Sequence, residues 1–111
     1  MITIEALRSF GADVDSGLER CLNKEDFYLK MINMALADAR FEELGPVLEQ
    51  KDYEKAFEMC HALKGTTGNV SLDPLYKVIC EMTELLRNKT DTDYTGLYKQ
   101  VVDLRNELLR M

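Results

Sequence analysis

The chain contains a single histidine, His61, and its sequence context makes that imidazole a candidate for chemistry. On a helical wheel of residues 53–70, at about 100° per residue, apolar side chains gather on one face and His61 lies about 130° from its centre. A lone histidine is more often a satisfied core residue, but the wheel directs this one outward. A neutral imidazole is a nucleophile near pH 7, since its ordinary pKa is about 6.5. The predicted core face comprises Tyr53, Ala56, Cys60, Leu63, Thr67 and Val70.

Two glycines and a lysine lie on the same outward side of this predicted helix. Glycine inside a helix costs about 1 kcal/mol relative to alanine, and Gly65, four residues after His61, leaves space beside the imidazole open. Lys64, three residues after His61, can bring an ammonium beside the ring. Taken singly, Gly68 fits a fraying helix end and Lys64 fits a solvated surface charge. Together they predict an imidazole that is approached by a bulky phosphorus electrophile, with Lys64 offsetting part of the phosphoryl charge.

The string that contains this histidine, CHALKGTTGNV over residues 60–70, resembles the signature of histidine-containing phosphotransfer (HPt) domains of two-component phosphorelays. The family pattern is His, any residue, Leu, Lys, Gly, two small hydroxyl residues, a small residue, Asn and an aliphatic residue. Each defined position is matched. Ser71 stands where the family usually has glycine, and the Gly45–Pro46 pair is unusual inside the preceding helix.

The resemblance implies a phosphorelay intermediate. His61 would accept a phosphoryl group from a receiver aspartate of a response regulator or hybrid sensor kinase and pass it to another receiver. The receiver would supply Mg²⁺, so no cofactor or metal is expected on this chain. The sequence has no Gly-rich phosphate loop, which predicts a carrier without an ATP site rather than an enzyme with autokinase activity. The expected phosphoryl-supporting residues are Lys64, Gly65 and Gly68, and the expected partner-docking residues are Phe57, Glu58 and Asn69.

Two other functions stay open at this point. The chain could be a helical-bundle adaptor in which His61 is inert, although an adaptor has no need of Lys64 and Gly65 beside an outward histidine. It could also be a phosphate sink, which accepts a phosphoryl group without onward transfer. The sequence does not separate a sink from a relay.

Composition narrows the class of protein further. The chain has 111 residues, with 14 Lys and Arg against 20 Asp and Glu, for a net charge of −6. Its 46% hydrophobic content is typical of a globular domain, and its acidity argues against nucleic acid or an anionic membrane as a partner. No apolar run is long enough to insert into a membrane, and the N-terminus does not resemble a signal peptide. With three well-separated cysteines, we expect a cytoplasmic monomer with reduced thiols.

The scarcity of glycine and proline and the abundance of Glu, Lys, Leu, Ala and Met predict an all-α fold. We expect one domain over residues 1–111, an antiparallel up-and-down four-helix bundle with short N-terminal helices packed on it. The short helices are expected within 4–21, at about 4–10 and 16–21. The bundle helices are expected at about 24–50, 53–70, 74–87 and 94–110.

The helix expected at 24–50 has two apolar stripes. Phe27, Met34, Phe41 and Leu48 recur every seven residues, which predicts the seam of the bundle. The second stripe, Tyr28, Ile32 and Leu36, must then be covered by the N-terminal segment or by a partner. We expect a bend near Gly45–Pro46 because proline removes a helical hydrogen bond. Expected helix caps are Asn23, Asp52 and Asp73.

Overall fold

The structure, a computed structural model, describes residues 2–111, and within them it contains seven α-helices and no strand. The all-α fold predicted from the sequence is confirmed. The helices are α1 (Ile4–Phe10), α2 (Val14–Arg20), α3 (Glu25–Leu36), α4 (Arg40–Glu49), α5 (Tyr53–Asn69), α6 (Asp73–Arg87) and α7 (Thr95–Leu109).

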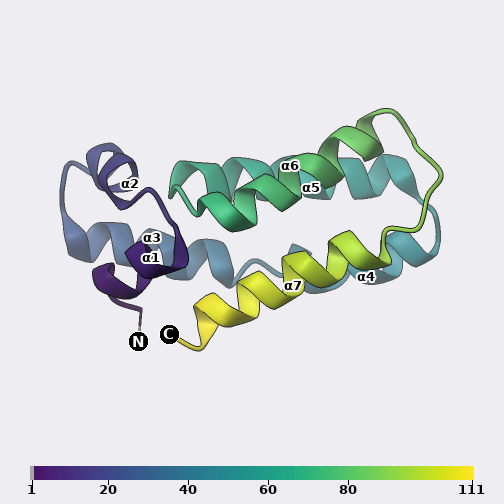
Figure 1. The fold of residues 1–111 in the computed structure, drawn as a ribbon. Coiled ribbons are helices and arrows are strands. Elements are labelled where there is room, and N and C mark those ends of the chain that lie inside the picture. The colour runs from purple at the N-terminus through teal and green to yellow at the C-terminus, as the bar shows by residue number, and fades with distance from the viewer. Residues whose placement is uncertain (1) are drawn as a thin grey trace.

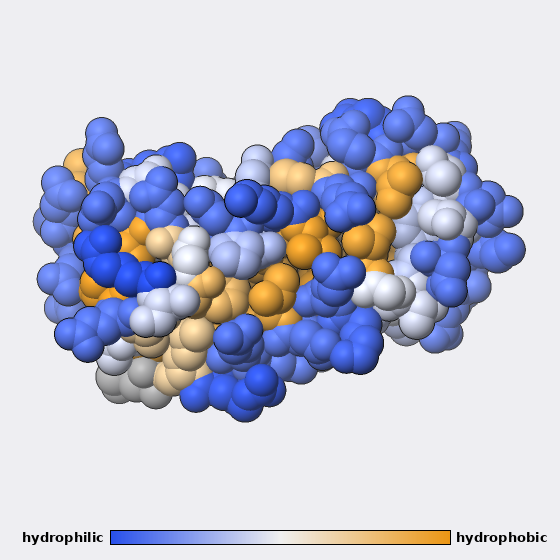
Figure 2. All heavy atoms as spheres, in the orientation of Figure 1, coloured by the Kyte–Doolittle hydropathy of each residue, from blue (hydrophilic) through white to orange (hydrophobic). Residues whose placement is uncertain are grey.

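The long helices form an antiparallel bundle in which α3 and α4 together occupy one position and α5, α6 and α7 occupy the others (Figure 1). The short helices α1 and α2 lie at the end of the bundle where α5 finishes and α6 begins. Figure 2 shows an apolar strip over α6 and α7 between hydrophilic surfaces. Half-buried side chains of these helices pack against the edge of the core, among them Val78, Leu85, Leu97 and Leu104.

The expectation of one long helix over residues 24–50 is wrong, because the helix breaks at residues 37–39. Asp38 is responsible locally: one carboxylate oxygen accepts from the backbone N–H of Arg40 and the other from its guanidinium, both at 2.9 Å. Across the bundle, Arg105 donates from Nε to the Leu36 carbonyl at the end of α3, over 2.9 Å. These contacts satisfy backbone groups that a helix break would otherwise leave unpaired.

The helix continues through Gly45–Pro46, where a bend was expected, since both residues lie inside α4. Proline lacks the N–H that would pair with the carbonyl four residues earlier, which belongs to Glu42. The Tyr98 hydroxyl of α7 approaches this carbonyl at 3.4 Å and donates to the neighbouring Phe41 carbonyl at 2.6 Å. Gly45 makes room for that ring, because a Cβ there would lie 3.0 Å from Tyr98 Cε2.

The predicted seven-residue seam is also wrong in its first half. Phe27 is 46% exposed and Met34 is 58% exposed, whereas the alternative stripe of Tyr28, Ile32 and Leu36 is fully buried. Of the two expected covers, the N-terminal segment or a partner, the N-terminal segment is found at Tyr28: Gly17 of α2 lies directly on the Tyr28 ring, where a Cβ would be 2.4 Å from Cε1. Because residues 37–39 are not helical, residues spaced seven apart on either side of them do not lie on one continuous helix face.

The helix starts were predicted with mixed success. Asp52 caps α5 as expected, accepting from the backbone N–H of Lys55 over 3.2 Å. Asn23 is not the cap of α3; that position is Lys24, and Asn23 has a left-handed φ of 57°. Asp73 is the first helical residue of α6, preceded by Leu72 at the cap position.

Candidate functional site

Helix α5 presents His61 to solvent. Its inward face is anchored by Ala56, Cys60, Leu63 and Thr67, all buried, while His61 is exposed. The outward direction predicted by the wheel is therefore confirmed. Cys60, next to the histidine in sequence, lies in the core, and burial raises the pKa of its thiol to about 12. This thiol stays protonated and is not a competing nucleophile.

An open hollow lies beside His61 on the outer surface of α5. It brings together Lys64, Gly65, Gly68 and Asn69, four of the residues singled out in the sequence. Lys64 is half-buried, and no carboxylate within residues 2–111 lies within ion-pair distance of its ammonium. The remaining lining comes from α2 and its cap, from the turn after α5 and from the start of α6, namely Asp13, Ser16, Arg20, Ser71, Asp73 and Tyr76.

The two glycines of this hollow differ in how much free space surrounds them. A Cβ on Gly65 would meet no atom within 4 Å, so the approach to the imidazole is open there. A Cβ on Gly68 would lie 2.9 Å from Cε1 of Tyr76. Gly68 is therefore explained by the close packing of α5 on α6, and not by fraying of the helix end as the sequence suggested.

Phe57 lies one turn before His61, and the two rings stack with centroids 5.8 Å apart and planes inclined by 21°. Arg87 at the end of α6 places its guanidinium carbon 4.9 Å from the centroid of the Phe57 ring. Phe57 is half-buried, whereas Glu58 is exposed and does not line the hollow. The structure thus brings Phe57 directly to the imidazole and leaves Glu58 at its margin.

The sequence analysis missed Arg20 and the role of Ser71. Arg20 Nη1 donates to the Gly68 carbonyl at 3.0 Å, to Ser71 Oγ at 2.8 Å and, more distantly, to the Asn69 carbonyl at 3.4 Å. These acceptors follow Arg20 by about fifty residues, so no local pattern could pair them. The one available signal was Ser71 itself, which departs from the family pattern.

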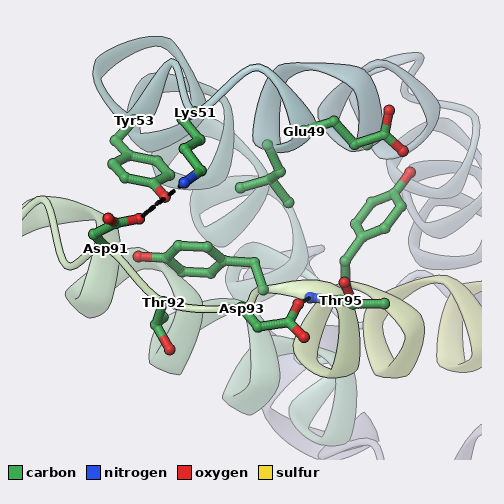
Figure 3. A pocket seen from close by; sticks show the side chains of 11 residues that line it. Glu49, Lys51, Tyr53, Asp91, Thr92, Asp93 and Thr95 are labelled. Atoms are coloured by element: carbon green, nitrogen blue, oxygen red, sulfur yellow. Dashed lines mark hydrogen bonds and ion pairs between the residues drawn. The ribbon is translucent and has the colours of Figure 1, made fainter.

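A second hollow lies at the other end of α5, near the turn from α4 and the loop before α7 (Figure 3). Several of its polar groups are already engaged with one another. Tyr53 donates to Asp91 over 2.8 Å, and this hydrogen bond, with burial, raises the pKa of Tyr53 to about 12. Lys51 approaches the same carboxylate at 3.7 Å. This hollow contains no histidine and is separate from the site around His61.

The fold and the site together define a helical bundle that exposes its one histidine on α5. A family model described as Hpt domain matches residues 30–110, nearly three quarters of the chain, and the chain belongs to this family. Comparisons with curated proteins and with solved structures gave no match. Membership implies a part in two-component histidine phosphotransfer as a carrier rather than a kinase.

Two features, a membrane-spanning helix and a metal-binding cluster, are absent from residues 2–111. None of the helices there has the length and apolar character needed to cross a membrane. In the same part of the chain, no three His, Cys, Asp or Glu side chains are grouped so that they could hold a metal ion.

Proposed function

We propose that His61 accepts a phosphoryl group from an aspartyl phosphate of a receiver domain and returns it to an aspartate of another receiver. The observation that supports this most directly is the exposed imidazole with open space over Gly65 and an ammonium, Lys64, in the same hollow. The family supports histidine phosphotransfer in general. The choice of acceptor and the direction of flow are part of this proposal.

The chemical step needs only groups at this site and on the donor. The electron pair of the imidazole nitrogen that carries no hydrogen attacks phosphorus, and a P–N bond forms. The P–O bond to the donor aspartate breaks, and that carboxylate leaves with the bonding electrons. Onward transfer reverses these events on a second aspartate. Mg²⁺ and the acidic pocket would belong to the receiver, so the chain would use no cofactor of its own.

Lys64 and Phe57 would assist in different ways. A phosphoryl group on the ring adds close to two negative charges, and the Lys64 ammonium would offset part of them. The Phe57 ring stacks on the imidazole and would limit its rotation, so that the ring would already be oriented before the donor docks. Gly65 would leave the path of the receiver unobstructed.

A relay and a phosphate sink share this site, so one experiment must follow both half-reactions. The chain is incubated with a phosphorylated receiver, separated from it, and then mixed with a second, unphosphorylated receiver. A relay transfers label to the chain and then onward, whereas a sink retains the label until it hydrolyses. No uptake from any receiver would favour the inert adaptor instead.

A further inference from the structure

Ser71 occupies an unfavourable backbone conformation that glycine would adopt more easily. Its φ is 57°, in the left-handed region, which residues with a side chain rarely adopt. The serine makes two contacts with the N-terminal segment. Its hydroxyl oxygen accepts from Arg20 Nη1 at 2.8 Å, and its carbonyl accepts from the backbone N–H of Asp13 at 3.0 Å. Only the first of these contacts needs the side chain.

The hydroxyl therefore serves to hold Arg20. One nitrogen of the guanidinium, Nη1, makes all the hydrogen bonds of Arg20, to Ser71 and to the carbonyls at the end of α5. A guanidinium has five N–H donors, so Nη2 and Nε remain available, and the side chain is exposed. Arg20 is thus fixed in place and still offers donors to the solvent. A side chain ordered in advance loses less entropy when it binds.

Arg20 lies within reach of any partner that docks on His61. The guanidinium is hydrogen-bonded to Gly68, which follows His61 by two helical turns on the same face, or about 10 Å along the axis. A specific interface covers about 800 Å² of each protein, which corresponds to a disc about 16 Å in radius. A partner centred on His61 would therefore also cover Arg20.

The charges around Arg20 indicate what group it would meet. The other charged residues in the hollow are Lys64, Asp13 and Asp73. Asp13 already accepts from the backbone N–H of Ser16, and no carboxylate of residues 2–111 forms an ion pair with Arg20. A planar guanidinium with an unengaged edge binds a carboxylate in a two-pronged geometry. The complementary group is a carboxylate on the docking partner.

We propose that Arg20, held by Ser71, is a docking residue that binds a surface carboxylate of the receiver domain, so that α2 contributes to the choice of partner. This inference rests on the proposed role of His61 as acceptor. Arg20 precedes residue 30, where the match to the family model begins, so this contact would be a feature of this chain added to the matched region.

The test measures single-turnover transfer from a phosphorylated receiver as a function of receiver concentration. Arg20→Gln should raise the half-saturating concentration about tenfold or more, because a hydrogen bond to a charged group contributes about 1.5–3 kcal/mol. The rate at saturation should stay within about twofold. Arg20→Lys should recover part of the loss. Lys99→Gln, which removes a positive charge that pairs with Asp103 on the exposed surface of α7, is the control for a change of net charge and should leave the half-saturating concentration unchanged.

Ser71→Gly separates docking from folding. Glycine relieves the left-handed backbone, so the thermal midpoint should hold or rise, while the loss of the hydroxyl should raise the half-saturating concentration several-fold. The inference is overturned if Arg20→Gln leaves that concentration unchanged, if Lys99→Gln raises it equally, or if Arg20→Gln lowers only the saturating rate. Phosphoramidate, a small donor that needs no docking, should charge every variant at the wild-type rate. Failure of wild type to be charged at His61 would instead contradict the proposed function.

Discussion

The ring of Phe57 stacks on the imidazole of His61, with the two centroids 5.8 Å apart and the planes inclined by 21°. The guanidinium of Arg87 covers the same phenylalanine at 4.9 Å. Three residues from two helices therefore form a contiguous group at the candidate acceptor. Their arrangement implies that the orientation of the imidazole depends on an aromatic side chain one turn away.

We expect Phe57→Leu to slow charging of His61 by phosphoramidate up to about tenfold, since aromatic pairs contribute about 0.5–1.5 kcal/mol beyond area burial. Phe57→Tyr keeps the ring and should retain most of the rate. Charging rates are compared with thermal midpoints for both variants. Equal rates for Phe57→Leu and wild type, with both proteins folded, would show that the stack does not orient the acceptor.

Gly65→Gln should fold, because a Cβ at this position meets no atom within 4 Å, and glutamine has the higher helix propensity. Transfer from a receiver should nevertheless fall sharply, because the new side chain stands beside the imidazole. Gly96→Gln is the matched control: a Cβ there also meets nothing, but the residue lies in α7, away from His61. A transfer rate for Gly65→Gln that equals the Gly96→Gln rate would exclude an access role.

Lys64→Ala should reduce the transfer rate or the lifetime of phosphohistidine about tenfold or less. The hollow is open to water, so screening limits the attraction between this ammonium and the phosphoryl group to about 1 kcal/mol. The variant should also lose part of the salt dependence of transfer. Decay and transfer are measured at low and high salt. Complete loss of acceptance by a folded variant would show a larger role than charge compensation.

The sequence predicted the site on α5 better than it predicted the segment that forms α3 and α4. The outward position of His61 followed from the spacing of core residues within α5, and that spacing is local. The break between α3 and α4 depends on Asp38 but also on Arg105, which lies sixty-nine residues after its acceptor, Leu36. The stripe with Phe27 and the stripe with Tyr28 were both visible in the sequence, but only the packing of Gly17 showed which one is buried.

At Pro46, too, the decisive contact is distant in sequence and could not be predicted. An internal proline is unfavourable by its own chemistry, and the sequence predicted a bend there. The Tyr98 hydroxyl, more than fifty residues away in sequence, donates to the Phe41 carbonyl and approaches the Glu42 carbonyl that has lost its usual donor. Ser71 was noted as a departure from the family pattern, but its contact with Arg20 required the fold.

Alkaline pH should destabilise the fold. Burial raises the pKa of Cys60 from 9.0 to about 12 and that of Tyr28 from 10.0 to about 12, so both groups are kept neutral in the native state. The unfolded chain ionises them at their ordinary values. Their contribution to stability is complete below pH 9 and is lost as the pH rises from 9 to 12, with a slope of at most about 1.4 kcal/mol per pH unit for each group.

Urea unfolding between pH 7 and pH 11 measures this slope. Cys60→Ala should be less stable at pH 7, because it removes a buried sulfur, but its unfolding free energy should fall less steeply above pH 9. Identical slopes for the two proteins would show that the thiol ionises equally in the folded and unfolded states.

The most direct test of the central claim is to locate the phosphoryl group after transfer from a phosphorylated receiver. Wild type and His61→Gln are incubated with the donor, and the label is characterised by its chemical stability and by peptide mapping. The account predicts an acid-labile, base-stable phosphoramidate on His61 in wild type and no label on the folded variant. Equal labelling of His61→Gln, or label on any other residue of wild type, would contradict it.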